Sequence, residues 1–219
     1  MTKTILLDLD GTLIDSRPGI VSSIHAALHD LGHNPETAGD LTWAVGPPIA
    51  EVWAKLLAQF DDDRVADGIA AYRQHYGLTG LYDATLYPGI ADALEDLYAS
   101  GLDLVLATSK RRDFAQRILE RFGLAPRFLG IYGSEPSGLL DAKADLVGHI
   151  LAREKLIAAH CVMVGDRRHD VEGAHANAMT AIGVLWGYGG AVELAEAGAD
   201  LVIAEPGELV AKVREALLF

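Results

Sequence analysis

Two aspartates, Asp8 and Asp10, directly follow the apolar run at residues 5–7. Side chains alternate along an extended chain, so both carboxylates point to the same side of it. Two like charges at that spacing repel each other unless a cation joins them. Such a pair suits nucleophilic attack, proton transfer or the binding of a metal ion. The alternative is an ordinary acidic turn, which the following Gly11 would permit.

Further polar residues with the same placement lie in the second half of the chain. Thr108 and Ser109 follow one apolar run, Asp166 and Asp170 follow another, and Lys143 opens an amphipathic segment. Taken singly, each has an ordinary structural explanation: a hydroxyl that caps a helix, a solvated lysine, or acids at the positive end of a helix dipole. Their meaning depends on whether the fold brings them together.

Short apolar runs alternate with amphipathic helical segments over most of the sequence. Fully apolar strands separated by helices indicate a parallel sheet covered on both faces, which is a doubly wound α/β core. Ligands bind at the carboxyl ends of the strands in such a sheet, where the candidate residues would lie. The expected strands are residues 5–7, 102–107, 128–132, 162–164, 180–184 and 201–203. The expected helices are residues 90–100, 113–122, 143–154, 170–177 and 207–218.

One block interrupts this alternation. Between Leu13 and Tyr87 the sequence has helical periodicity and no convincing strand, with helical patterns at residues 20–31, 49–57 and 64–76. We expect residues 14–85 to form a helical insertion that acts as a lid. Residues 1–13 and 86–219 would then form a discontinuous α/β core.

The order of the candidate residues resembles the haloacid dehalogenase superfamily in its phosphatase form. The segment from Asp8 to Thr12 resembles the first motif of that superfamily, and Thr108 resembles the second. Lys143 resembles the third, and the segment from Gly165 to Asp170 resembles the acidic fourth motif. The resemblance covers essentially the whole chain. It implies a Rossmann-like core with an inserted α-helical cap domain, as in phosphoglycolate-phosphatase-like members.

The resemblance implies a role for each acidic residue. Asp8 would attack phosphorus and form an aspartyl-phosphate, while Asp10 would first protonate the leaving group and then activate water. Mg²⁺ would be bound by Asp8, by the backbone carbonyl of Asp10 and by Asp166, because hard oxygen ligands suit this ion. Asp170 would act through water or from behind the direct ligands.

The remaining candidates would hold the substrate. Thr108, the backbone N–H of Ser109 and the ammonium of Lys143 are expected to bind the oxygens of the transferred phosphoryl group. Gly46 lies in a loop, Trp43 to Pro48, that looks like the cap loop of phosphoglycolate-phosphatase-like members, so we expect it to contact the substrate.

Other charged residues are expected mainly at the surface. Arg17, Lys55 and Arg73 are cap cations that could meet a second anionic group of the substrate, although a solvated position is the stronger expectation for each. Residues 110–112 are basic and follow Thr108, where a solvated helix start is at least as well supported as anion steering. Residues 167–169 are interpreted as surface or supporting residues.

Several functions remain open at this point. The segment at residues 133–143 and the Gly-Asp-Arg form of the fourth motif resemble a subgroup that includes phosphoglycolate phosphatases and nucleoside 5′-monophosphatases. A phosphosugar mutase is a minor alternative, as is a catalytically idle binding module. The idle module is disfavoured because it has no need of an acid/base residue such as Asp10.

Composition limits the partners and the compartment. The formal net charge is −13, from 31 acidic and 18 basic residues, which argues against nucleic acid or an anionic membrane surface as a partner. The single cysteine, Cys161, allows no internal disulfide, and no apolar run approaches the roughly 20 residues that span a bilayer. We therefore expect a cytoplasmic protein, as a monomer or homodimer, and the resemblance implies that its substrate is a small phosphorylated metabolite.

Overall fold

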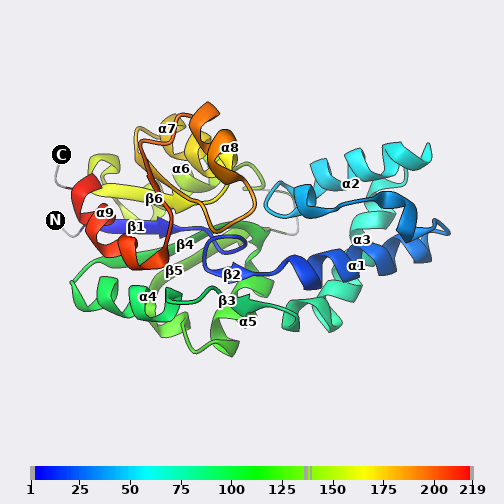
Figure 1. Cartoon of the computed structure of the whole chain (residues 1–219), viewed down its shortest axis with the longest axis horizontal. Helices are drawn as coiled ribbons and strands as arrows, with labels where there is room; N and C mark the ends of the chain where they lie inside the picture. The colour runs from blue at the N-terminus through cyan, green and yellow to red at the C-terminus, as the bar shows by residue number, and fades with distance from the viewer. Residues whose placement is uncertain (1–2, 136–137, 139, 218–219) are drawn as a thin grey trace.

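The computed structural model describes residues 3–135, 138 and 140–217, and its centre is a six-stranded parallel sheet. The strand order is β5-β4-β1-β6-β7-β8, so the predicted doubly wound α/β core is confirmed (Figure 1). The strands are β1 (Thr4–Leu7), β4 (Asp103–Arg111), β5 (Phe128–Ser134), β6 (Cys161–Gly165), β7 (Thr180–Val184) and β8 (Leu201–Ile203). Each lies where the apolar runs predict it. Residues 136–137 and 139, part of the segment 133–143 singled out above, fall outside the described residues.

Helices cover both faces of this sheet, with α6, α7 and α8 on one side and α4, α5 and α9 on the other (Figure 1). Their bounds are α4 (Ile90–Ala99), α5 (Arg112–Arg121), α6 (Lys143–Glu154), α7 (Arg168–Ala176), α8 (Gly190–Glu196) and α9 (Leu209–Ala216). The predicted helices are confirmed, although α9 is shorter than expected because a 3-10 turn, Pro206–Glu208, precedes it. The sequence pattern missed α8, because its seven residues are too few to show periodicity and follow a glycine-rich loop.

The sheet separates two apolar layers because successive residues of a strand face opposite sides. Ile5 and Leu7 of β1 pack into the layer shared with Leu94 of α4, whereas Leu6 packs into the layer shared with Leu146 of α6. All five side chains have no solvent-exposed area. Burial on both faces fixes the strands, and therefore fixes the side chains at their carboxyl ends.

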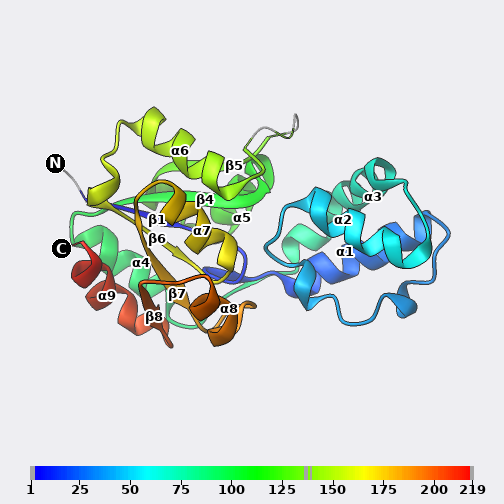
Figure 2. The same ribbon diagram turned by 90° about the horizontal axis from the view of Figure 1, so that it is seen from above.

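A group of helices inserted after β1 lies to one side of the sheet (Figure 2). The helices are α1 (Arg17–Asp30), α2 (Ile49–Leu57) and α3 (Val65–Leu78), with 3-10 turns at Pro35–Ala38, Thr42–Ala44, Ala58–Phe60 and Gly80–Tyr82. The helical patterns predicted for this block are therefore confirmed. Trp53 of α2 is 0% exposed and packs near Tyr72 of α3, whereas Tyr76 of α3 is 1% exposed and packs on Phe114 of α5 in the core. The apolar interior of this inserted cap is continuous with the core layer that contains α4 and α5.

The two linkers between core and cap pair with each other. β2 (Ile14–Asp15) and β3 (Thr85–Leu86) form an antiparallel pair in which Ile14 lies opposite Leu86. The expectation of no strand between Leu13 and Tyr87 is therefore wrong, because two-residue strands are too short to show alternation. We propose that this pair delimits the cap, residues 14–85.

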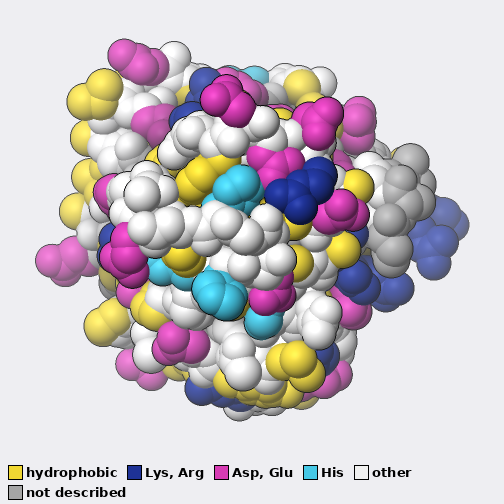
Figure 3. All heavy atoms as spheres, turned by 90° about the vertical axis from the view of Figure 1, so that its right-hand side faces the viewer, with side chains coloured by type: hydrophobic (Ala, Val, Ile, Leu, Met, Phe, Trp, Pro, Cys, Tyr) yellow, Lys and Arg dark blue, Asp and Glu magenta, His cyan; other side chains and the backbone are white. Residues whose placement is uncertain are grey.

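The outer face of the cap carries acidic, basic and histidine side chains interspersed with one another (Figure 3). Some of them pair, as His75 of α3 does with Asp30 of α1, whose Nε2 and Oδ2 atoms lie 2.7 Å apart. Within the described part of the chain, no helix is both long and apolar enough to cross a membrane.

Close approach of α1 to the turn at Gly80–Tyr82 yields a stability prediction. A Cβ atom on Gly19 would lie 1.9 Å from the backbone oxygen of Gly80, which cannot rotate away. Overpacking of this kind costs about 1–3 kcal/mol, so we expect Gly19→Ala to lower the free energy of unfolding by about that amount. Urea denaturation measures it. Gly207→Ala is the matched control, because nothing lies within 4 Å of its added Cβ, and equal losses in both variants would contradict the packing explanation.

Candidate active site

Asp8 and Asp10 lie immediately beyond β1, as the sequence predicts. The N–H of Asp8 donates to the carbonyl of Val164 (3.0 Å), so Asp8 is held by the neighbouring strand β6. The chain then turns tightly, and Gly11 adopts a φ of +80°. A Cβ atom at Gly11 would lie 2.2 Å from Oδ2 of Asp166, so only glycine lets the turn approach that carboxylate.

Three buried carboxylates meet at the carboxyl ends of β1 and β6. One oxygen each of Asp8, Asp166 and Asp170 lies within 4.8 Å of the other two. Burial raises the pKa of Asp8 most; the Lys143 ammonium offsets part of this effect and Asp170 adds to it, so the pKa is about 7. Burial, followed by the Asp170 and Asp8 carboxylates, raises the pKa of Asp166 well above its ordinary value.

This cluster fits a divalent cation. Carboxylate oxygens are the ligands that Mg²⁺ prefers. Burial, and after it the neighbouring carboxylates, disfavours the charged forms of Asp8 and Asp166, and a bound cation would stabilise those forms. Asp170 is further fixed from the start of α7, where its Oδ2 accepts the N–H of Arg167 (3.1 Å). An acidic residue three positions into a helix commonly reaches back in this way.

Lys143, the first residue of α6, neutralises part of the cluster. Its ammonium lies 2.9 Å from Oδ1 of Asp8 and 2.7 Å from Oδ1 of Asp170, and it donates to the carbonyl of Ala107 (2.9 Å). Burial by itself would lower the pKa of Lys143, but Asp170 and Asp8 outweigh it, so the pKa lies above its ordinary value. Lys143 thus remains a cation although it is 6% exposed.

The end of β4 supplies the hydroxyl and amide donors. Thr108 is buried and its Oγ1 accepts the N–H of Lys110 (3.2 Å), while Ser109 is half-buried. β4 continues to Arg111 through an irregular register after Ala107, where the sequence indicated a helix start. Within this stretch the side chain of Lys110 is only 6% exposed.

Lys110 is a site residue that sequence reasoning missed. Its Nζ lies 2.9 Å from Oδ1 of Asp10 and donates to the hydroxyl of Tyr76 (2.7 Å), which belongs to the cap. Oδ1 of Asp10 also accepts the hydroxyl of Ser16 (2.5 Å). Asp10 is therefore held from the core by Lys110 and from the cap hinge by Ser16. The basic run at residues 110–112 does not by itself predict that one of its side chains is buried beside an aspartate.

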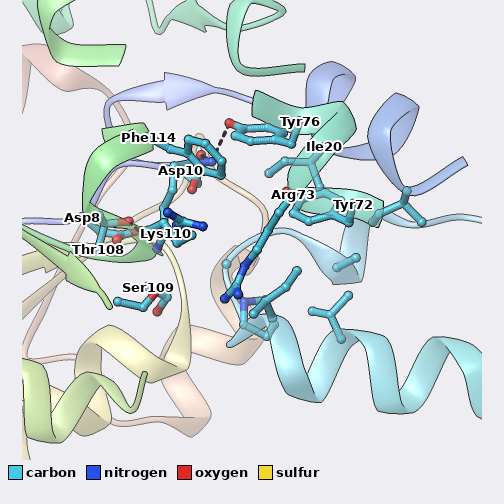
Figure 4. A pocket seen from close by; sticks show the side chains of 18 residues that line it. Asp8, Asp10, Ile20, Tyr72, Arg73, Tyr76, Thr108, Ser109, Lys110 and Phe114 are labelled. Carbon is cyan, nitrogen blue, oxygen red and sulfur yellow. Dashed lines mark hydrogen bonds and ion pairs between the residues drawn. The ribbon is translucent and has the colours of Figure 1, made fainter. Parts of the chain in front are cut away.

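A cavity of about 60 Å³ lies between these residues and the cap. Figure 4 shows Asp8, Asp10, Thr108 and Ser109 on the core side and Ile20, Tyr72, Arg73 and Tyr76 on the cap side. Gly46 also lines this cavity, as its place in the cap loop predicts. The volume is enough for a few water molecules. With the cap in this position, Asp8 and Asp10 are only 4% and 6% exposed.

The cap cations have different environments. Arg73 lines the cavity, and Figure 4 shows its side chain extending from α3 toward the core. Lys55 instead lies over the ring of Trp43, 4.1 Å from its centre, and Arg17 pairs with Asp40 at the surface (3.3 Å). Only one of the three candidates is thus placed to meet a substrate.

The basic residues of the fourth motif also separate. Arg168 is exposed and His169 is half-buried, close to the expectation for them. Arg167 is buried, contrary to a surface position, because its guanidinium reaches the cap loop and pairs with Glu193.

Comparison with known proteins identifies the family. Residues 5–184 match the haloacid dehalogenase-like hydrolases. The chain belongs to this family. The resemblance seen in the sequence motifs is therefore confirmed, and the parallel sheet with its inserted cap is the fold of this hydrolase family.

Several relatives carry functional names. A 5′-nucleotidase from Pseudomonas aeruginosa is 40% identical over 190 residues, which cover 87% of this hydrolase and 86% of the relative. The tyrosine-protein kinase PtkA from Mycobacterium tuberculosis is 42% identical over 188 residues, which cover 85% of this chain but only 63% of the kinase. A phosphoglycolate phosphatase from Aliivibrio fischeri is 27% identical over 207 residues, with 91% of both chains covered.

A solved structure shares the whole architecture. The crystal structure of a predicted phosphatase from Clostridium acetobutylicum superimposes with a TM-score of 0.89 at 33% identity, covering 98% of this chain and all of the other. With the family match, these similarities make the chain a phosphatase of the haloacid dehalogenase-like hydrolases.

The charged cluster predicts how a cation changes stability with pH. The pKa of Asp8 is about 7 in the folded protein and 3.8 in an unfolded chain, so its contribution to stability is fully present below about pH 4 and is lost as pH rises through 7. A divalent cation binds the deprotonated carboxylates and reverses this loss. We expect Mg²⁺ to raise Tm more at about pH 8 than at about pH 5.5.

Thermal unfolding with and without Mg²⁺ at the two pH values measures this difference. Asp166→Asn is the control, because it removes one of the three carboxylates, and its Tm should respond little to Mg²⁺. A Tm increase in the unaltered protein that is the same at both pH values would contradict the assignment of the cation to this cluster.

Proposed function

We propose that this phosphatase hydrolyses small phosphomonoesters with Mg²⁺, through a covalent phosphoryl intermediate on Asp8. The observation that carries the proposal is the setting of Asp8. Its carboxylate is buried, lies 2.9 Å from the Lys143 ammonium, and borders the same cavity as Asp10 and Thr108. A nucleophile, an acid/base and phosphate donors thus converge on one space that the cap shields from water.

In the first step, an oxygen of Asp8 attacks phosphorus and forms an aspartyl-phosphate while the bond to the leaving oxygen breaks. Asp10 gives its proton to that oxygen, so the product leaves as an alcohol. Thr108, the N–H of Ser109 and the ammonium of Lys143 stabilise the charge on the phosphoryl oxygens.

In the second step, water attacks the phosphorus of the aspartyl-phosphate. Asp10, now a carboxylate, accepts the proton of that water, and inorganic phosphate leaves with Asp8 regenerated. Lys110 and Ser16 hold the Asp10 carboxylate in position, with Oδ1 of Asp10 2.9 Å from the Lys110 ammonium and 2.5 Å from the Ser16 hydroxyl.

Mg²⁺ fits the same cluster. Asp8, Asp166 and the backbone carbonyl of Asp10 would hold it directly, and Asp170 would support it from the start of α7. When bound, Mg²⁺ supplies positive charge that offsets the approach of a phosphate anion to carboxylates.

Phosphate release from a panel of phosphomonoesters tests the proposal. With Mg²⁺ we expect turnover by the unaltered protein and none by Asp8→Asn, which lacks the nucleophile. Asp10→Asn should retain attack on an activated ester such as p-nitrophenyl phosphate but hydrolyse the intermediate slowly, so that a phosphoenzyme accumulates. Losses of about a hundredfold or more in turnover are typical when such groups are removed. Substantial phosphate release by Asp8→Asn would rule out the covalent mechanism.

Two substrate classes have support of different kinds. Arg73 lines the cavity. Burial, followed by the nearby Arg111, lowers the pKa of Arg73, so an anionic group beside it would stabilise its charged form. A second anionic group on a small substrate, as in phosphoglycolate, would provide that neighbour. The 5′-nucleotidase relative instead supports nucleoside 5′-monophosphates, for which the cavity of about 60 Å³ would have to widen by cap opening.

Arg73→Met separates these classes. For a small substrate with a carboxylate, we expect KM to rise by about 10- to 100-fold, because one charge-assisted contact contributes roughly 1.5–3 kcal/mol. For p-nitrophenyl phosphate the change should be small. Lys55→Met removes a cap cation that lies on Trp43 and should leave both KM values unaltered. An unchanged KM for the carboxylate substrate, beside efficient turnover of nucleotides, would favour the nucleotidase alternative.

A further inference from the structure

Arg167 is a buried arginine that joins the core to the cap. It precedes α7, directly after Asp166, and its Nη1 donates to the backbone carbonyl of Val45 in the cap loop. Its Nε donates to Oε1 of Glu193 in α8 (2.8 Å). Its side chain is 11% exposed and that of Glu193 is 25% exposed. An arginine taken out of water needs partners for its N–H groups, and one of these partners belongs to the cap.

Glu193 fixes the direction of that side chain. The same oxygen, Oε1, also accepts the backbone N–H of Arg168 (2.9 Å), so the carboxylate is tied to the start of α7. Burial alone would raise the pKa of Glu193, but the Arg167 guanidinium and this N–H outweigh it and lower the pKa. The rigid fork of an arginine can serve two acceptors in different directions at once, as it does here with Glu193 and Val45.

The cap loop is shaped to receive Arg167. Val45 is fully buried, and the next residue, Gly46, has a φ of +104°. A Cβ atom at Gly46 would lie 3.0 Å from Cγ and 3.2 Å from Nη1 of Arg167. Gly46 also lines the cavity over the carboxylates, whereas Arg167 lines a separate groove between the cap and the core helices α7 and α8. Arg167 therefore contacts the loop that covers the substrate space without bordering that space.

The backbone of Arg167 contacts the carboxylate cluster. Its N–H donates to Oδ2 of Asp170 (3.1 Å), and its neighbour in the chain is Asp166. The placement of this one residue thus depends on the cap loop through its guanidinium and on the carboxylate cluster through its backbone.

We propose that Arg167 and Glu193 form a latch that stabilises the closed cap and aligns it with the carboxylate cluster. Arg167 is then a positioning residue for the hydrolysis proposed above, on which its kinetic role rests. When the cap opens, the guanidinium loses the Val45 carbonyl while Glu193 keeps it oriented for the next closure. The latch raises the fraction of molecules that are closed over the substrate.

Backbone hydrogen exchange tests the latch without depending on turnover. In Arg167→Met and in Glu193→Gln, we expect the backbone amides of residues 43–46 and 49–52 to exchange faster by about 5- to 150-fold, the usual range of coupling between two sites. Arg168→Met is the matched control, because it removes an exposed arginine one position away and should not alter this segment. Thermal unfolding of each variant reports whether the fold is intact.

Kinetics supply the second readout. Arg167→Met should lower kcat/KM for phosphate release by a similar factor, and Arg167→Lys should recover only part of it because one ammonium does not reproduce the two-direction contact. Exchange at residues 43–46 and 49–52 that matches the unaltered protein in both folded variants would overturn the latch. If Arg167→Met does not fold, Glu193→Gln alone decides. An unaltered protein that releases no phosphate overturns the proposed function, and the exchange result still decides the latch.

Discussion

The burial of several carboxylates in one place is the constraint on which the rest of the site depends. Asp8, Asp166 and Asp170 stand at the ends of β1 and β6 with almost no exposure, an arrangement that costs free energy through desolvation and mutual repulsion. Lys143 offsets part of that cost by contacting Asp8 and Asp170. The cluster persists because two apolar layers hold β1 and β6 from both faces. A well-packed sheet therefore maintains a local arrangement of charge that would not hold together alone.

The same cluster explains why the cap matters. A closed cap removes water, which strengthens each electrostatic interaction inside but also removes the solvent that would otherwise stabilise charge. The cap therefore closes through polar contacts that keep charged groups partnered. Tyr76 accepts from Lys110 at the cavity, and Val45 accepts from Arg167 outside it.

Much of the core could be predicted from the sequence because its signals are local. Each strand is a short apolar run, and Asp8, Thr108 and Asp166 follow such runs, so the rule that ligands bind at strand ends placed them correctly near one another. Lys110 and Arg167 could not be predicted in the same way. Their side chains contact Tyr76 and Val45, which are distant in the sequence. A periodic pattern of apolar residues does not predict such contacts. The strands β2 and β3 and the helix α8 were missed because they are too short to show a period.

The pairing of β2 with β3 has a consequence for how such a protein can change over evolutionary time. Because Ile14 lies opposite Leu86, the chain leaves the core and returns to it at nearly the same point. The insertion therefore needs to span only a short gap between its two ends. Because the entropic cost of closing a loop grows slowly with loop length, a longer insertion adds little to this cost. An insertion that joins the core through this one pair of linkers can therefore be lengthened, remodelled or exchanged while the carboxylates beneath it keep their positions. Substitutions in the cap can therefore change which substrate is bound without moving the catalytic residues of the core.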